Sequence, residues 1–458
     1  MTGLGIVATY SARFWTLVIG LGLIAGLSAA LLVGLLRLTE RLTYGTHGHT
    51  LLSAVEASAG WRRIVALLVA AGIVVVALRL IGRSAVGGTE VSEAIWLRSG
   101  AVDFMRGLAR GVLAIVTVGM GVSLGRESGP QLFGAAFASR LSEWAALPVW
   151  QRRLLVASGA GAGFAAVYNV PLGGTLLALE VLLGSLALPL VLPALLMSLT
   201  ATGVAWIFIG DQPTYHVASS RFEASQLVFA IVMGPVIGLV GTGWTRLIST
   251  ANRRKPKGAG RWAAPFGAFL LLGLLAQQYP QLLGNGKDIV QLGITGSVGL
   301  GLLFMLLVLK PLVTAACIAS GSPGGLFTPT FAVGVLLSGV AAAIWGHVWH
   351  VSVPGAYALI GGAAFLAAAM QGPLAGAVLV LELTRHFDAL MVPTLVAVVE
   401  ATVLSRKLGA HSIYSARMAP EGMADSSPTA NAASVATIHA LDEALPAEFA
   451  HPPSNRTR

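Results

Sequence analysis

The sequence predicts an all-α polytopic membrane protein built from two similar halves with broken helices, and three observations lead to this prediction. The 458-residue chain is 55% hydrophobic and only 10% charged, whereas an average soluble domain carries about 25% charged residues. Apolar runs of about 20 residues, the length that crosses a bilayer as a helix, recur along the chain. Breaks rich in glycine and proline interrupt these runs, and they recur after about 200 residues.

The expected elements follow from the apolar runs and the polar segments between them. The segment between Arg83 and Arg98 is polar, and we expect a broken helix or re-entrant turn at an interface there. Residues 1–418 are expected to form a membrane transport domain of two repeats, and residues 419–458 a flexible tail too short for an appended regulatory domain. The expected spans are residues 14–38, 62–81, the run from 110, 188–210, 226–248, 262–277, 297–319, the run to 345, 356–370, 374–383 and 391–404.

Charge and cysteine content agree with a membrane protein. The formal net charge is +10, and we attribute it to cytoplasmic loops, which carry an excess of Lys and Arg, rather than to a nucleic-acid partner. The basic loop 252–261 is therefore expected in the cytoplasm. The 56 glycines suit close helix packing in lipid. The single cysteine, Cys317, excludes an intrachain disulfide. No cleavable signal peptide is evident at the N-terminus.

Residues 124–130 form a glycine-bracketed ionic cluster between two apolar runs. A carboxylate at membrane depth is costly, so Glu127 is expected to face a protein-lined or watery path. Gly125 and Gly129 allow backbone conformations that other residues resist, and Pro130 fits the first turn of a following helix. We therefore expect a helix that begins inside the membrane with Glu127 at its start. Its free N–H groups and positive dipole end suit an anion.

The second half of the chain repeats features of the first. Residues 169–180 and 371–382 both contain Pro-Leu-x-Gly, then apolar residues, then a glutamate (Glu180 and Glu382) nine positions after the proline. A second glycine and proline break, residues 320–329, lies about 200 residues after the break around Glu127. Paired broken segments at corresponding places indicate a transport site where the two halves meet.

Four stretches in order resemble motifs of one family, the CLC chloride channels and chloride/proton antiporters. Residues 125–130 resemble its Gly-Lys/Arg-Glu-Gly-Pro motif, and residues 324–329 resemble its Gly-x-Phe-x-Pro motif. Residues 169–174 with Glu180 resemble its Asn-Ala-Pro-Leu-Ala-Gly helix, and Tyr414-Ser415 resembles the Tyr-Ser of its last helix. The order and spacing agree from about residue 14 to 418. The short tail resembles the bacterial type, without appended CBS domains.

This resemblance implies two inverted-topology halves with broken, tilted helices, and a homodimer in which each subunit has its own anion path. It also implies a multi-pass protein of the cell inner membrane. Glu127 becomes the gating carboxylate and proton acceptor, which occupies the path when ionised and withdraws when protonated. Tyr414 would supply a central hydroxyl, and Arg110 a favourable field for anions. The other residues that the resemblance assigns to the anion path are Leu326, Phe327, Gly325, Val86, Gly87, Arg126 and Ser128.

Three departures from the family motifs bear on mechanism. Proline stands one place later, at Pro130, and we expect a modest effect on donor geometry. When the sequence is aligned on Glu90, Val86 takes the place of the family's central serine, so that hydroxyl is expected to be missing. Val181 takes the place of the internal proton-path glutamate of the exchangers. A valine cannot carry protons, so an exchanger would need another route, through water or Glu180.

Each candidate residue also has a structural interpretation. Glu127 would alternatively form a salt bridge with the neighbouring arginine, and Tyr414 would alternatively anchor the chain at the membrane interface. Glu180 and Glu382 are expected to cap or bridge within the repeat, with proton relay by Glu180 as the alternative. Lys310 either draws anions toward the path or belongs to a satisfied buried pair.

The function predicted from the sequence is transmembrane chloride transport gated by Glu127, with chloride/proton exchange as the first interpretation. A passive channel or uniporter is the alternative, and a preference for fluoride or nitrate a further one, although Tyr414 argues against the fluoride-exporting branch. A membrane enzyme or scaffold lacks support, because no metal-ligand cluster and no nucleophile with a base is recognisable. We expect no catalysis, metal or cofactor. Cation transport is disfavoured by the basic residues near the path.

Overall fold

The computed structural model describes residues 10–45, 50–81, 90–218, 221–385 and 390–417. Within these ranges the chain is helical, and the only β-type pairing is one isolated bridge between Gly125 and Gly325. Six of its helices, named below as α1, α3, α9, α10, α13 and α14, are long and apolar enough to cross a membrane. The predicted all-α polytopic fold is therefore confirmed. The predicted tail, residues 419–458, lies outside the described residues.

The first half of the chain runs from α1 to α9. Its elements are α1 (Ala12–Tyr44), α2 (Leu51–Ala57), α3 (Gly60–Ile81), α4 (Val91–Leu97), α5 (Phe104–Gly119), α6 (Ser128–Trp144), α7 (Val149–Tyr168), α8 (Pro171–Leu176), the π-helix η3 (Leu177–Leu183) and α9 (Leu188–Ile209).

The second half repeats this order and ends in a short 3₁₀-helix. Its elements are α10 (Ala224–Arg253), α11 (Gly260–Gln278), the 3₁₀-helix η4 (Pro280–Leu282), α12 (Lys287–Thr295), α13 (Leu300–Ala319), α14 (Phe327–Trp345), α15 (Pro354–Met370), α16 (Pro373–Thr384), α17 (Met391–Lys407) and η5 (Ser415–Arg417).

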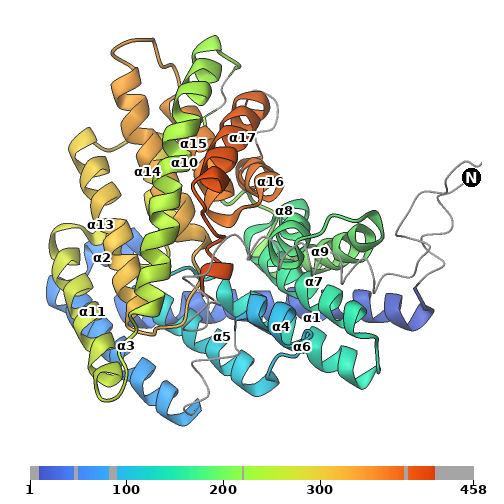
Figure 1. Cartoon of the computed structure of the whole chain (residues 1–458). Coiled ribbons are helices and arrows are strands. Elements are labelled where there is room, and N and C mark those ends of the chain that lie inside the picture. Colours follow the sequence, from blue (N-terminus) through green and yellow to red (C-terminus); the bar gives the residue numbers. More distant parts are fainter. Residues whose placement is uncertain (1–9, 46–49, 82–89, 219–220, 386–389, 418–458) are drawn as a thin grey trace, which may run out of the picture.

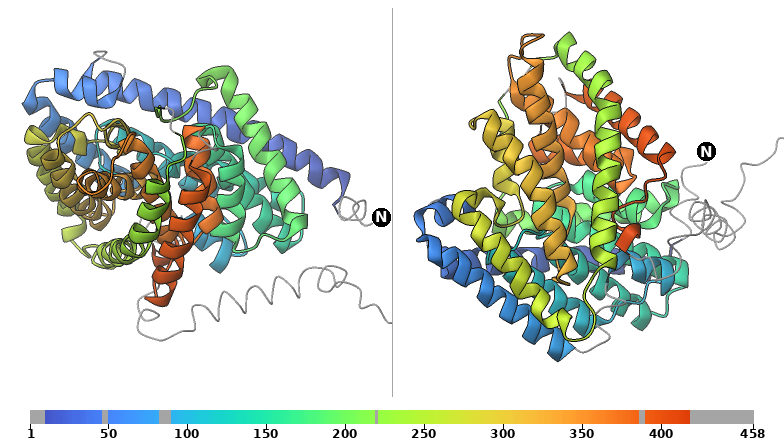
Figure 2. Two further views of the ribbon diagram at one scale, coloured as in Figure 1. Left: turned by 90° about the horizontal axis from the view of Figure 1, so that it is seen from above. Right: turned by 60° about the vertical axis from the view of Figure 1, so that its left-hand side comes forward.

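The two halves lie side by side with differently directed helices. In Figure 1, α1 runs across the view, whereas α10, α13 and α14 run up it. The right-hand view of Figure 2 shows η5, drawn in red, between the two halves. Corresponding helices pack in corresponding pairs: α6 on α7 and α14 on α15, α1 on α9 and α10 on α17. Contacts of α3 with α11 and of α8 with α16 join the halves.

Each half contains a helix break of the same construction. The chain leaves α5 through Gly121, with φ of 101°, and leaves α13 through Gly321, with φ of 83°. This left-handed backbone region favours glycine, because a Cβ would crowd the following carbonyl. A few residues later α6 begins in the first half and α14 in the second. The two breaks predicted around residues 125–130 and 321–329 are therefore confirmed as interruptions between helices.

A second pair of junctions also repeats. Helix α7 ends at Asn169 and α15 ends at Gln371, both with a left-handed φ of 59°. The next helix begins two residues later with a proline at its first position, Pro171 or Pro373. Proline suits this position because the first N–H of a helix has no intrahelical partner. The recurring Pro-Leu-x-Gly sequence thus marks the start of a short helix in each half.

Glutamates from each half cap a helix of the other half. Glu180 in η3 accepts hydrogen bonds from two N–H groups at the start of α16, and Glu382 in α16 accepts two at the start of α8. This reciprocity relates the halves by an approximate two-fold axis. Both glutamates therefore cap helices, but across the two halves and not within one repeat as expected. The distances are 3.2 Å from Leu374 N, 2.6 Å from Ala375 N, 3.0 Å from Leu172 N and 2.6 Å from Gly173 N.

Some helices extend beyond the spans predicted from the apolar runs, because capping and buried contacts lengthen them. Helix α1 begins earlier than predicted, because Ser11 caps it through a hydrogen bond from the N–H of Phe14 (3.2 Å). It continues to Tyr44, whose buried hydroxyl donates to Met120 O at 2.9 Å. In the polar segment predicted to break, α4 is a single short helix, and residues 82–89 lie outside the described residues.

The capping role of Glu180 predicts a stability effect without a transport effect. Glu180→Gln replaces one of two accepting oxygens with a donor, so we expect a loss of about 1–2 kcal/mol in unfolding free energy. Thermal unfolding of the purified protein in detergent measures the loss. Glu56→Gln is the control, because Glu56 is exposed on α2. A variant with normal stability but abolished proton movement would contradict the capping role and favour proton relay.

Candidate functional site

Glu127 stands at the N-cap of α6, where the two helix breaks meet. Its side chain is 1% exposed. The carboxylate reaches into the second half, where Oε1 accepts a hydrogen bond from the N–H of Phe327 at 2.7 Å. Oε2 accepts from the hydroxyl of Tyr168 at 3.2 Å and from Thr328 Oγ1 at 3.5 Å. The carboxylate thus lies at the N-terminus of α14, a position that suits negative charge.

Two glycines hold the breaks together beneath this carboxylate. Gly125 N donates to Gly325 O at 2.7 Å, and Gly325 N donates to Gly125 O at 2.8 Å. A Cβ built on either glycine would collide with the Glu127 carboxylate. Glycine is therefore required at both positions by the space that Glu127 fills. The N–H of Gly325 is used within this pair, so Gly325 shapes the site rather than offering a free donor.

Aromatic and hydroxyl groups surround the carboxylate. The Tyr168 hydroxyl lies 2.7 Å from Thr328 Oγ1, which links the end of α7 to the start of α14. The Arg126 guanidinium lies over the Tyr168 ring, 5.1 Å from its centroid. Cation–π contacts of this kind favour the charged form of arginine. The alternative salt bridge of Glu127 with Arg126 is not formed within the described residues, since Arg126 faces the ring instead.

Lys310 anchors the chain segment that leads to Glu127. It is completely buried, and Nζ donates to Ser123 Oγ at 2.8 Å and to Gly284 O at 3.1 Å. The same loop binds the segment a second time, because Gly284 N donates to Gly121 O at 2.8 Å. Of the two interpretations of Lys310, the structure therefore supports the satisfied buried group. It holds the break in place from the α13 side.

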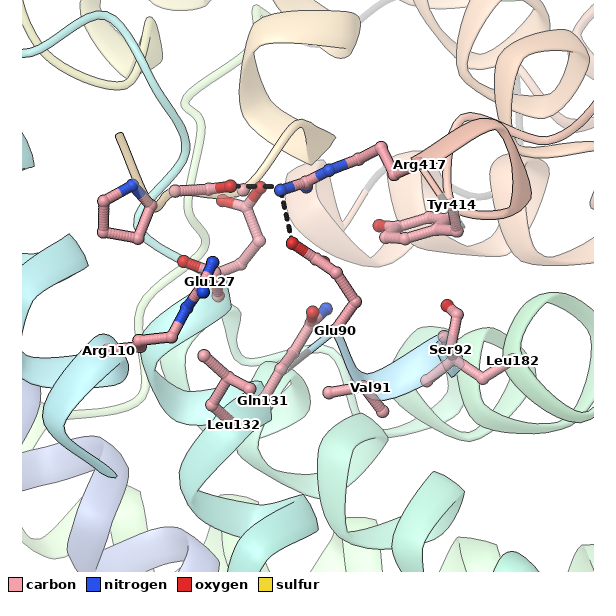
Figure 3. Close-up of a pocket in the computed structure, with 14 residues that line it drawn as sticks. Glu90, Val91, Ser92, Arg110, Glu127, Gln131, Leu132, Leu182, Tyr414 and Arg417 are labelled. Carbon is pink, nitrogen blue, oxygen red and sulfur yellow. Dashed lines mark hydrogen bonds and ion pairs between the residues drawn. The ribbon is translucent and has the colours of Figure 1, made fainter. Parts of the chain in front are cut away.

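A small cavity adjoins Glu127 and is lined by residues from both halves (Figure 3). Among the predicted site residues, Tyr414, Ser128, Gly325 and Arg110 line it together with Glu127. The Tyr414 hydroxyl and Ser128 Oγ are buried and have no hydrogen-bond partner among the described residues. Buried polar groups are rarely left unpaired. These hydroxyls therefore favour an anion or water inside the cavity.

Other predicted site residues lie apart from the cavity. Phe327 acts through its N–H on Glu127, as described above, and the neighbouring Leu326 is the N-cap of α14. Glu180 caps α16 and does not line the cavity. Val86 and Gly87, which the resemblance assigns to the anion path, lie outside the described residues.

Several site residues were not predicted. Thr328 lies within the motif at residues 324–329 and Tyr168 directly precedes the motif at residues 169–174, but only the fold shows that they contact Glu127. Glu90 from the first half of the chain and Arg417 from the second also line the cavity. Arg417 had one available signal, because it is a charged residue three positions after Tyr414. Gln131 lies one helical turn beyond Glu127 on α6, and that spacing was the signal for it.

Basic and acidic side chains both border the cavity, and the basic ones are more numerous once the nearby Lys255 is included. Arg110 and Arg417 line it, and Lys255 lies near Arg417 and Glu90 at the end of α10. Burial, together with the nearby positive charge of Arg417, lowers the pKa of Lys255 to about 8. Glu90 opposes these cations and pairs with Arg417 at 2.6 Å. The described residues include no cluster of three metal-ligating side chains. The local charge is suited to an anion.

The sequence matches a protein family described as voltage gated chloride channel over residues 65–406. It is 30% identical over 343 residues to an H(+)/Cl(−) exchange transporter ClcA of Salmonella arizonae, covering 72% of this chain and 70% of that protein. It is 31% identical over 346 residues to a ClcA of Cronobacter sakazakii, covering 72% and 71%.

Solved structures share the fold. A slow cyanobacterial Cl⁻/H⁺ antiporter aligns with a TM-score of 0.79 at 22% identity, over 89% of this chain and 98% of that one. A CLC-type fluoride/proton antiporter aligns with a TM-score of 0.72 at 22% identity, over 91% and 99%. At this identity the alignments establish the arrangement of helices and not the transported ion.

The space between the paired glycines predicts a specific double-mutant result. Gly325→Ala should lower the unfolding free energy by about 2 kcal/mol, because the new methyl group overlaps the Glu127 carboxylate. Adding Glu127→Ala should restore most of the loss, because it empties that space. Thermal unfolding in detergent measures both effects.

Gly301→Ala is the matched control for this pair. A Cβ at Gly301, on α13, meets open space, so alanine there should be neutral or slightly stabilising. If Glu127→Ala gave no recovery in the Gly325→Ala protein, the carboxylate would not occupy the position described here.

Proposed function

Because this chain belongs to the voltage gated chloride channel family, we propose that it carries chloride across a membrane in exchange for protons, with Glu127 as the gate. The members of this family are transporters rather than enzymes. The chain is a multi-pass membrane protein, and we place it in the bacterial inner membrane as a homodimer. Chloride and protons are its proposed partners.

One observation supports this function above the others. The Glu127 carboxylate is held by a helix N-terminal N–H and by hydroxyls, and these are the groups that bind a dehydrated anion. A carboxylate in this position competes with a transported anion for the same donors. Protonation removes its charge and weakens these bonds. The position therefore links proton binding to anion access through one side chain.

The proposed cycle follows from that competition. With Glu127 ionised, the carboxylate fills the site at Phe327 N and closes the path. With Glu127 protonated, the side chain withdraws and an anion takes its donors. Chloride then moves into the adjoining cavity, where the unpaired Tyr414 hydroxyl would bind it. Release of the proton returns the carboxylate to the site and displaces the anion.

A passive chloride channel or uniporter is the second candidate, and Val181 favours it. Val181 stands in η3, where the resemblance places the inner proton-path glutamate, and the adjacent Glu180 is engaged in capping α16. An exchanger would therefore move protons to the inner side without a carboxylate at that position. Transport of fluoride or nitrate in place of chloride is a further alternative. It is tested by substituting the anion in the flux measurement below.

Exchange and passive flow are separated by one measurement on the purified protein in liposomes. A chloride gradient is imposed, and chloride efflux and external pH are recorded together. We expect chloride to drive protons uphill, which requires coupling. Chloride efflux without proton movement would contradict exchange and identify a channel or uniporter, with Val181 as the physical reason.

Glu127 predicts the sign of the pH dependence. Lower external pH protonates the carboxylate and frees the path, so chloride turnover should rise as the external solution becomes more acidic. Glu127→Gln mimics the protonated form, so it should carry chloride at a rate independent of pH and move no protons. Wild-type pH dependence and proton coupling in this variant would contradict the gating role.

The hydrogen bond from the Tyr168 hydroxyl is expected to help hold the Glu127 carboxylate in the closed position. Tyr168→Phe removes one donor to the carboxylate, and a hydrogen bond to a charged group amounts to roughly a tenfold factor in equilibrium. The ratio of chloride flux at neutral pH to flux at acidic pH should therefore rise severalfold; the ratio is used because the transported anion loses the same donor. Tyr215→Phe is the control, because Tyr215 is equally buried and its hydroxyl has no partner in the described part of the chain. Equal flux ratios in the two variants would count against this hold on Glu127.

A further inference from the structure

A second carboxylate lies in the same cavity as Glu127. Glu90 is the N-cap of α4, and Arg417 is the last residue of η5, so the two come from different halves of the chain. Arg417 Nη2 lies 2.6 Å from Glu90 Oε1. Figure 3 shows these side chains directed at one another beside Tyr414. The cavity therefore contains one carboxylate on a helix N-terminus and another on a guanidinium.

The Arg417 guanidinium has binding capacity that Glu90 does not use. The Arg417 side chain is only 8% exposed, and Nη1 makes a long contact of 3.4 Å with Gly324 O. Its Nε is buried and has no hydrogen-bond partner among the residues described. The Tyr414 hydroxyl and Gln131 Nε2, which also line the cavity, are likewise buried without partners. Donor groups of Arg417, Tyr414 and Gln131 thus border one cavity.

Arg417 is fixed in this position by its backbone. The Asn252 side chain, at the end of α10, donates to Arg417 O at 3.2 Å. This bond places Arg417 beside the start of the basic loop, residues 252–261. Arg110 and Lys255 add positive charge around Glu90, so the surroundings remain favourable to an anion even when Glu90 is ionised.

We propose that Arg417 is an anion ligand of the transport path, and that the Glu90 carboxylate is an internal competitor that an incoming anion displaces. This inference rests on the proposed anion transport. A guanidinium presents several N–H donors in a fixed plane and stays charged, so it can pass from a carboxylate to a transported anion without a proton step.

In this proposal Glu90 competes with an anion for Arg417, as Glu127 competes with an anion for the donors at the start of α14. Each carboxylate occupies anion donors from within the protein and leaves when an anion arrives. A bound carboxylate lowers the apparent affinity for an external anion, because the anion must first displace it. Removing the Glu90 charge should therefore tighten anion binding. Removing Arg417 as well should abolish that gain.

The experiment is chloride binding to the full-length protein in detergent, measured by isothermal titration calorimetry. Glu90→Gln should bind chloride severalfold more tightly than the wild type. The double variant Glu90→Gln with Arg417→Gln should bind about tenfold more weakly than Glu90→Gln alone, the factor expected for one charge-assisted contact. The double variant avoids the unpaired Glu90 carboxylate that Arg417→Gln alone would leave in the cavity.

Arg253→Gln is the matched control, because Arg253 is an exposed arginine in the last turn of α10, outside the cavity. It removes the same charge from the same region and should leave chloride affinity unchanged. Equal affinities of Glu90→Gln and the double variant would overturn the role of Arg417. A loss in Arg253→Gln as large as in the double variant would also overturn it, since general charge would then explain the effect.

The test of Arg417 and the test of the proposed function use different measurements, so their outcomes can be told apart. Chloride flux by the wild-type protein in liposomes decides whether the protein transports chloride. The difference between Glu90→Gln and the double variant decides whether Arg417 binds the anion. Flux by the wild type with no such difference would leave the proposed transport in place and remove the inference about Arg417.

Discussion

The reciprocal backbone pair between Gly125 and Gly325 is the constraint on which the site depends. Two hydrogen bonds, of 2.7 and 2.8 Å, join helix breaks that belong to opposite halves of the chain. They bring the start of α6 against the start of α14, and the missing Cβ atoms leave room for the Glu127 carboxylate. The Glu127 carboxylate is thus positioned by the main chain, and its partners are an N–H group and neutral hydroxyls.

The remaining structure supports that pair from both sides. Lys310 holds the segment before Glu127 against the loop at Gly284, at the cost of burying an ammonium group that neutral acceptors must satisfy. The exchanged caps of Glu180 and Glu382 fix the two halves relative to each other across α8 and α16. Duplication of one broken-helix unit therefore produces two facing helix starts and the contacts that keep them facing.

The sequence predicted the fold class, the two helix breaks and the position of Glu127, because each has a local signal. Apolar runs predict spans, and glycine with proline beside a charge predicts a break. The partners of Glu127 had no such signal: Tyr168 and Thr328 meet only when α7 and α14 pack together. The same limit applies to Glu90 and Arg417, which form an ion pair although they are far apart in the sequence. The role of Val86 stays a prediction, since it lies outside the described residues.

The central claim is that the Glu127 carboxylate occupies an anion site at the start of α14. An experimental structure of the Glu127→Gln protein in bromide, with anomalous scattering to locate the ion, tests it most directly. The account predicts a bromide bound to Phe327 N and the Tyr168 hydroxyl, in the place of the wild-type carboxylate. Bromide absent from this place, while the Gly125–Gly325 pair remains intact, would contradict it.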